Sequence, residues 1–285
     1  MPQKDTNEWD IVISSKRKFF NILLFSDLIK YKDLIFMFIK RDFVTFYKQT
    51  ILGPLWYIVQ PLVNTIVFTI IFGNLAKLPT DGMPPFIFYM AGSIAWSYFA
   101  VCLQATSNTF VSNAGIFGKV YFPRLTVPIS HIIISLLQFA IQFLLFIIFL
   151  IYFIYSGSAI SLDFKVLLLP LILLHAAFLS LACGMIISSL TAKYRDLTFA
   201  MTFFVQLWMY ASPVVYPFSL IPENYQILAA LNPMTAIIES FKLCFLGEST
   251  IQFVHIQISL GMTVFLFIFG LILFNKVEKN FMDTV

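Results

Sequence analysis

The sequence predicts an all-α, polytopic membrane protein, and three observations support this class. Of the 285 residues, 60% are hydrophobic and only 11% are charged, well below the roughly 25% charged residues of soluble domains. The apolar residues fall into repeated runs, several of them long enough to cross a bilayer as helices. The basic residues are concentrated in alternate connecting segments. We therefore expect six transmembrane helices, an N-terminal amphipathic interface helix and re-entrant gate helices on the outer side.

The expected elements follow one another simply along the chain. Residues 1–26 are a cytoplasmic tail, 27–52 the interface helix, 53–274 the transmembrane domain and 275–285 a second cytoplasmic tail. The third span is longer than a bilayer requires, so it should tilt or protrude. The expected spans are 53–73, 86–111, 126–155, 165–190, 197–212 and 254–274.

The helix expected at 27–52 has a basic face and an apolar face. At 100° per residue, the polar arc contains Lys30, Asp33, Lys40, Arg41 and Lys48. The apolar arc contains Ile35, Phe38, Ile39, Phe43 and Phe46. Such a helix lies in the lipid interface with its basic side chains near anionic headgroups. The pair Gly53-Pro54 then ends the pattern, because proline fits the first turn of a new helix.

Asp42 is the exception, because it falls in the middle of the apolar arc. A carboxylate that faces hydrocarbon costs about 2.5–3.5 kcal/mol at the bilayer centre and less at the interface. Two explanations remain open from the sequence. Asp42 either forms a local ion pair with Arg41 or Lys48, or a cap, or it lies where another protein covers the helix.

The distribution of basic residues predicts that both ends of the chain are cytoplasmic. With this orientation, all but three of the 18 lysines and arginines lie on the inside. The three on the outside are Lys77, Lys165 and Lys242. An excess of this kind on one side orients membrane proteins with the basic loops in the cytoplasm.

The segment 213–247 is expected to dip into the membrane from outside and return. Prolines divide it into short pieces, and the apolar piece from Met234 to Leu246 is shorter than the roughly 20 residues of a span. Backbone of this kind must lie against protein or a water-filled cavity, so we expect it to line a wet exit. Glu239 needs a polar partner, which favours a gate over an external cap. The expected gate residues are Pro213, Tyr216, Pro217, Pro233 and Glu239.

The spans carry neutral polar and aromatic side chains in register, and almost no ionisable groups. Hydroxyls and amides suit sugar hydroxyls, and ring faces suit the C–H faces of pyranoses. Each stripe, taken singly, is at least as well explained by helix–helix contacts, whereas three uncharged stripes together favour a sugar path over an ion path. The candidate path residues are Tyr57, Gln60, Asn64, Phe86, Tyr89, Ser93, Trp96, Ser97, Gln104, Asn108, Thr202 and Gln206.

The cytoplasmic loop 112–125 is a second candidate surface for a soluble partner. We expect Ser112 or Asn113 to cap a short helix that ends before Pro123, and such a helix can occupy a groove of a partner. A plain basic loop is the alternative. With the interface helix, this loop gives the candidate docking residues Lys40, Arg41, Asp42, Lys48, Lys119 and Arg124.

The sequence has no motif for chemistry of its own. Gly115 to Lys119 has the wrong spacing for a phosphate loop and no Ser or Thr after the lysine. No histidine has a carboxylate or cysteine at ligand spacing, no nucleophile elbow is present, and the three cysteines are expected to pack in apolar surroundings. We therefore expect no catalytic residue, no metal, no bound cofactor and no nucleic acid partner.

Four motifs in order carry a resemblance to a known family. They are KRDF…YKQTILGPLWYIVQPL at 40–62, AKYRDLTF at 192–199, SPVVYP at 212–217 and LNPM at 231–234. Over most of 36–275 the chain resembles the membrane subunits of polysaccharide-exporting ABC transporters, the type-2 permeases that move O-antigen, capsule and teichoic acid chains. One departure is Phe46, where the family commonly has arginine before the tyrosine.

The resemblance implies a function and a set of partners. It implies an inner-membrane homodimer with two ATPase subunits that bind ATP and Mg²⁺, an interface helix riding on the ATPase, and periplasmic gate helices in 213–247. The dimer would translocate a lipid-linked polysaccharide through its channel, in contact with membrane lipids. The alternative is a membrane enzyme, a polymerase or glycosyltransferase for lipid-linked glycans, which would need Arg, His or carboxylate clusters on a large outer loop. A secondary transporter would need an intramembrane carboxylate or two matching halves.

Overall fold

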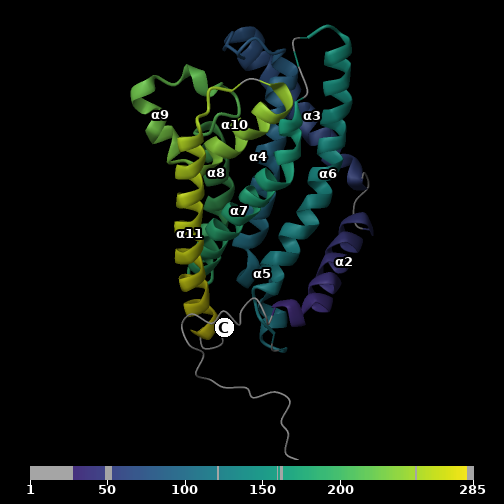
Figure 1. Ribbon diagram of the computed structural model, residues 1–285. Helices are drawn as coiled ribbons and strands as arrows, with labels where there is room; N and C mark the ends of the chain where they lie inside the picture. Colours follow the sequence, from purple (N-terminus) through teal and green to yellow (C-terminus); the bar gives the residue numbers. More distant parts are fainter. Residues whose placement is uncertain are drawn as a thin grey trace, which may run out of the picture.

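The computed structural model describes residues 28–48, 53–120, 122–158, 160, 163–247 and 249–280. Within these ranges the chain is helical and contains no strand, and the long helices run side by side (Figure 1). The all-α membrane class is therefore confirmed. The expected tails lie outside the described residues, except that the last helix continues past 274 as far as Asn280.

The described part of the chain contains five helices that are long and apolar enough to cross a membrane. They are α3 (Trp56–Phe68) with its π-helical continuation η2 (Thr69–Leu75), α4 (Pro85–Ser107), α6 (Thr126–Tyr155), η3 (Phe164–Leu168) with α7 (Leu169–Thr191), and α11 (Phe253–Asn280). Before them comes α2 (Lys32–Lys48), which lies obliquely against α6 (Figure 1).

The fifth expected span is shorter than the sequence indicated. Helix α8 (Leu197–Tyr210) has 14 residues and rises only about 21 Å, less than the roughly 30 Å hydrocarbon core of a bilayer. It is followed by α9 (Glu223–Ala230) and α10 (Pro233–Leu246), which are bent by 105° relative to each other. Both lie near the end of the bundle opposite the C-terminal end of α11 (Figure 1).

The end expected for the second span, at residue 111, is wrong. Helix α4 stops at Ser107, and α5 (Thr109–Phe117) begins almost at once. Hydroxyls compete for the backbone here, because Thr109 Oγ1 donates to the carbonyl of Thr106 at 2.7 Å. Ser112 and Asn113 therefore lie inside α5 and do not cap it, and Asn113 Nδ2 donates back to the Thr109 carbonyl at 3.0 Å.

Helix α4 is the centre of the bundle. It packs against α3, α6, α7, α8 and α10, and 78% of its most apolar window is buried, against 17–33% in the other four long helices. Aromatic rings fill the neighbouring space between α6 and α10, where Phe146 lies 5.7 Å from Phe241 and 5.5 Å from Phe245 between ring centroids. The middle of one copy is therefore filled with side chains.

Helices α7 and α11 approach each other closely at a glycine. A Cβ atom added at Gly270 would lie 2.6 Å from the carbonyl oxygen of Ala182 on α7, and real side chains do not come so near a backbone. Small residues at such contacts let membrane helices pack tightly. Gly261, on the same helix, has nothing within 4 Å of the corresponding position.

Replacing Gly270 with alanine should therefore push α11 away from α7. We expect G270A to lower the stability of the purified protein by about 1–3 kcal/mol, as overpacking does, and to lower its melting midpoint in detergent. G261A is the matched control and should leave the midpoint unchanged or slightly higher, because alanine favours helix. Equal midpoints for the two variants would contradict this close packing.

Candidate functional site

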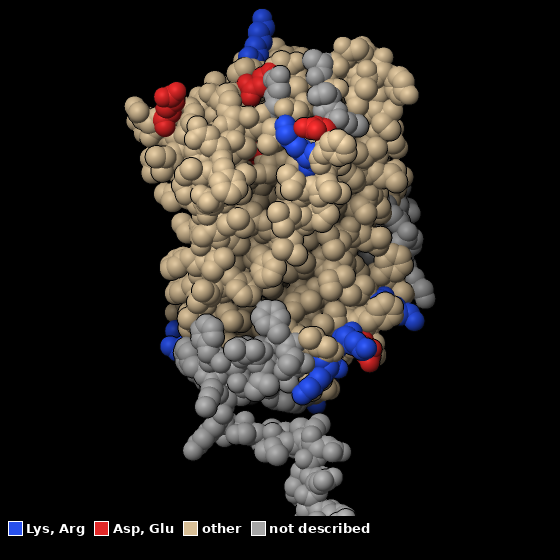
Figure 2. All heavy atoms as spheres, in the orientation of Figure 1, with Lys and Arg blue, Asp and Glu red and all other residues tan. Residues whose placement is uncertain are grey.

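Charged side chains lie at the two ends of the molecule. On the face shown in Figure 2, a broad band without Lys, Arg, Asp or Glu separates these ends. The end with α5 and the C-terminal part of α11 is the one where α2 begins (Figure 1). We call it the inner end, and the opposite end, with α9 and α10, the outer end.

At the inner end, α2 is fixed on α6 by an aromatic contact. Phe38 is buried, and its ring lies 5.7 Å from that of Phe122, which precedes α6. The guanidinium of Arg41 lies over the same Phe38 ring, 4.8 Å from its centroid. The part of the apolar arc around Phe38 therefore faces the protein and not lipid.

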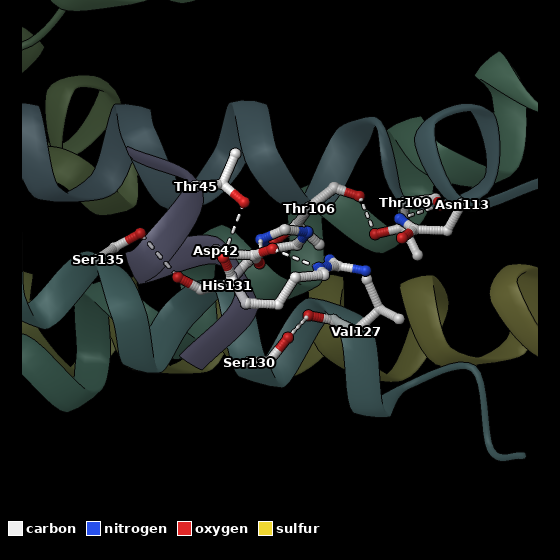
Figure 3. Close-up of polar contacts among 10 residues, drawn as sticks. Asp42, Thr45, Thr106, Thr109, Asn113, Val127, Ser130, His131 and Ser135 are labelled. Carbon is white, nitrogen blue, oxygen red and sulfur yellow. Dashed lines mark hydrogen bonds and ion pairs between the residues drawn. The ribbon is translucent and has the colours of Figure 1, made fainter. Parts of the chain in front are cut away.

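Asp42 points toward α6 (Figure 3). Its Oδ1 accepts a hydrogen bond from Arg41 Nε at 2.7 Å, and its Oδ2 lies 3.6 Å from Nδ1 of His131 on α6. The first explanation left open by the sequence is met, because Asp42 pairs with Arg41. The helix beside it is α6 of the same chain, and coverage by another protein stays a prediction. Asp42 is thus placed to hold α2 on α6, and this position does not favour the expected role in docking.

The other expected docking residues differ in accessibility. Lys40, Arg41 and Lys119 are exposed, and the side chain of Lys48 lies outside the described residues, as does that of Phe46. Arg124 is buried and engaged within the chain, because its Nη1 donates to the carbonyl of Glu278 at 2.8 Å. Arg124 therefore ties the start of α6 to the end of α11. We call Lys40, Arg41 and Lys119 the basic inner surface.

The candidate path residues separate into a buried group and an exposed group. On α4, Tyr89, Ser93 and Trp96 are buried, and the half-buried Phe86 packs on Phe149 of α6 with ring centroids 4.9 Å apart. The helix wheel predicted that these residues share one arc along a sugar path. Because α4 is surrounded by five helices, these four side chains face protein of the same copy.

The polar members on the outside of the bundle remain open to a neighbour. Tyr57, Ser97 and Asn108 are half-buried. The exposed members are Gln60 and Asn64 on α3, Gln104 at the inner part of α4, and Thr202 and Gln206 on α8. We call these five the polar surface set.

At the outer end, the backbone that follows α8 is irregular and lies inside the bundle. Residues 212–215 are buried, and Val214 lies against α4 at Gly92, about 10 Å along the helix from its start. A Cβ atom at Gly92 would lie 2.7 Å from the Val214 carbonyl oxygen. Only glycine permits this approach. We call residues 211–217 the gate segment. The sequence predicted that backbone here would line a wet exit, whereas the structure packs 212–215 against protein.

Lys242 of α10 supplies the hydrogen bonds that this backbone needs. Its Nζ donates to the carbonyl oxygens of Pro213 at 2.6 Å and Tyr216 at 3.4 Å, and to Oε1 of Glu239 at 3.1 Å. It also lies 3.9 Å from the centroid of the Phe88 ring on α4. Lys242 and Glu239 are 1% and 2% exposed, so this is a fully buried ion pair. An ammonium has three N–H donors, and here each has an acceptor.

The polar partner expected for Glu239 is thus Lys242, and a second one is Ser249, whose Oγ donates to Oε2 at 2.9 Å. Among the other expected gate residues, Pro213 and Tyr216 meet Lys242 through their carbonyls. Pro217 is buried, and Pro233 begins α10 and accepts from Ser259 Oγ at 2.9 Å.

Asn232 closes the same region from the start of α10. Its Oδ1 accepts from Trp208 Nε1 at 2.9 Å and from the Met234 backbone N–H at 3.2 Å. Its Nδ2 donates to Ser212 Oγ at 2.9 Å and to the Ala211 carbonyl at 3.2 Å. A single amide therefore caps α10 and holds the end of α8.

Sequence reasoning missed Gly92, Asn232 and Lys242 as site residues. The signal for Lys242 was its position three residues after Glu239, which places both on one face of a helix. Gly92 has no such signal, because its partner Val214 is distant along the chain. Among the residues that the structure describes, no three His, Cys, Asp or Glu side chains come together as a metal site would require.

Replacing Asn232 with alanine should loosen the junction of α8 and α10. We expect N232A to cost about 1–3 kcal/mol, because a helix cap and the partner of a Trp N–H are lost together. The melting midpoint in detergent should fall and the near-ultraviolet dichroism of the tryptophans should weaken. N74A, at an exposed asparagine on η2, is the matched control; an equally small effect of both would contradict the role of Asn232.

Comparison with known proteins agrees with this architecture and with the resemblance of the motifs. The chain is 28% identical over 252 residues to the O-antigen export system permease protein RfbA of Klebsiella pneumoniae, covering 88% of this chain and 94% of the relative. It is 25% identical over 228 residues to the protein of the same name from Myxococcus xanthus, covering 79% and 84%. The profile of the ABC-2 type transporter family matches residues 33–246. Because this match spans more than half of the sequence, the chain belongs to the ABC-2 type transporter family.

Proposed function

We propose that this chain is the transmembrane subunit of an ATP-driven exporter that moves a lipid-linked surface polysaccharide, such as O-antigen, across the bacterial cytoplasmic membrane. The observation that carries this proposal is the similarity, over nearly the whole chain, to permeases named for O-antigen export. Both termini lie in the cytoplasm in this proposal, because the inner end carries the excess of basic residues.

The energy comes from two ATPase subunits, which hold ATP and Mg²⁺. These subunits dock at the inner end, on α2 and α5. The basic inner surface offers exposed cations for this contact. The contacts of Phe38 with Phe122 and of Asp42 with His131 on α6 link α2 to the transmembrane bundle.

The polysaccharide passes between two copies of the chain. The reason is that α4 and the aromatic rings between α6 and α10 fill the middle of one copy, so no room remains there for a polymer. The polar surface set on α3, α4 and α8 offers amides and a hydroxyl to the sugar hydroxyls, without a charge that would attract ions.

Deletion of the gene in its native host tests this function against the enzyme alternative. We expect the deletion strain to keep making the polysaccharide but to retain it inside the cell on its lipid carrier. Surface labelling and extraction of lipid-linked glycan measure the two pools, and re-expression should restore display. Polysaccharide that is no longer synthesised would favour a polymerase or glycosyltransferase instead, and unchanged surface display would contradict export by this chain.

Reversing the charges of the basic inner surface should separate the permease from its ATPase. We expect K40E/K119E to reduce co-purification of the ATPase at least about tenfold, since loss of two charge contacts at an interface has effects of this size, while membrane insertion is kept. K77E reverses an exposed lysine at the outer end and should bind the ATPase like the natural chain. If K40E/K119E retains the ATPase fully, the proposed docking surface is contradicted.

A further inference from the structure

We propose that Lys242 is the positioning residue that holds the gate segment closed against α4. This inference rests on the proposed function, because it assigns the gate segment to the outer exit of the exporter. It concerns the resting transporter and does not depend on the identity of the polysaccharide.

The gate segment depends on Lys242 for hydrogen bonds. Its backbone is irregular, so the carbonyls of Pro213 and Tyr216 have no helical partner, and unsatisfied backbone groups are costly away from water. Lys242 Nζ donates to both carbonyls. The ammonium thus replaces the water that an open, wet exit would supply.

Three elements meet at the Nζ atom of Lys242. Lys242 Nζ contacts the gate segment through its two carbonyls, Glu239 on α10, and the face of the Phe88 ring on α4. The Glu239 carboxylate balances the charge and is itself held by Ser249. Because α10 packs on α4, a displacement of the gate segment away from these two helices must break the bonds of Lys242 to the carbonyls.

The gate segment also contacts α4 directly. Val214 lies directly on Gly92, where even a methyl group has no room. This contact is short and is made by the backbone of Val214, and it sets where the segment lies. The bonds from Lys242 set how its carbonyls point. Opening the outer end between α4 and the gate segment requires that both contacts separate.

The test is leakage through the resting transporter. The chain and the ATPase that co-purifies with it are reconstituted into vesicles loaded with calcein, without ATP and without polysaccharide. We expect K242M to raise the rate of calcein release about tenfold, the shift that corresponds to the loss of one hydrogen bond to a charged group. K165M removes an exposed lysine of the outer end and should release dye like the natural chain.

A double variant separates positioning from charge balance. In E239Q/K242M no buried charge is left unpaired, so the melting midpoint should recover relative to K242M, but the dye release should stay high because the carbonyls still lack their donor. E239Q alone keeps the donor and should leak little. If vesicles with the double variant release dye as slowly as those with the natural chain, Lys242 only neutralises Glu239. This result would overturn the proposal.

Gly92 gives a test that leaves all charges in place. G92A should push Val214 off α4 and raise dye release although Lys242 is intact. If vesicles with G92A and vesicles with K242M both release dye as slowly as those with the natural chain, the proposal is overturned as well. Neither result bears on export itself, since the deletion experiment decides that function separately.

Discussion

Irregular backbone inside an apolar bundle must find hydrogen-bond partners, and in this protein Lys242 provides them. The helix α8 is too short to cross the membrane, so the chain that follows it enters the bundle without a helical ladder of its own. The ammonium of Lys242 serves two of its carbonyls, Glu239 balances the charge, and Asn232 closes the junction with α8. The positions of α8, α10 and the gate segment all follow from this arrangement.

Buried ion pairs of this kind are weak sources of stability, because desolvation offsets most of their attraction. Removing only one member of such a pair is nevertheless costly, because the other charge stays buried without its partner. The pair Lys242–Glu239 is therefore better understood as a device that defines one position of the gate segment. The inner end uses the same chemistry more loosely, where Asp42 meets Arg41 and His131 at the junction of α2 and α6. Helix α6 then continues to the aromatic cluster on α10, so packed side chains connect the two ends of the molecule.

The class of the fold could be predicted from composition and from the lengths of apolar runs, because these depend on lipid and not on particular neighbours. The anomaly at Asp42 correctly indicated a contact, but its partner His131 comes from another helix and has no mark in the sequence. The length of α8 was overestimated because the apolar run continues beyond Tyr210. Pro213 disfavours helix in the residue before it, and the contacts of 211–215 with Gly92, Asn232 and Lys242 hold the chain that follows. The stripe predicted on α4 includes Tyr89 and Trp96, which are buried against protein, since the wheel of one helix does not say which helices surround it.

In the proposed function, the chain is a conduit that depends on a nucleotide-hydrolysing partner for its movement. Reconstituted vesicles that contain the purified chain and lipid-linked polysaccharide test this most directly, with the polymer that reaches the opposite side measured by its accessibility to a glycan-degrading enzyme. We expect translocation only when the ATPase subunit and ATP are both present on the side of the inner end. Translocation, or chemical change of the glycan, by the chain alone would contradict it.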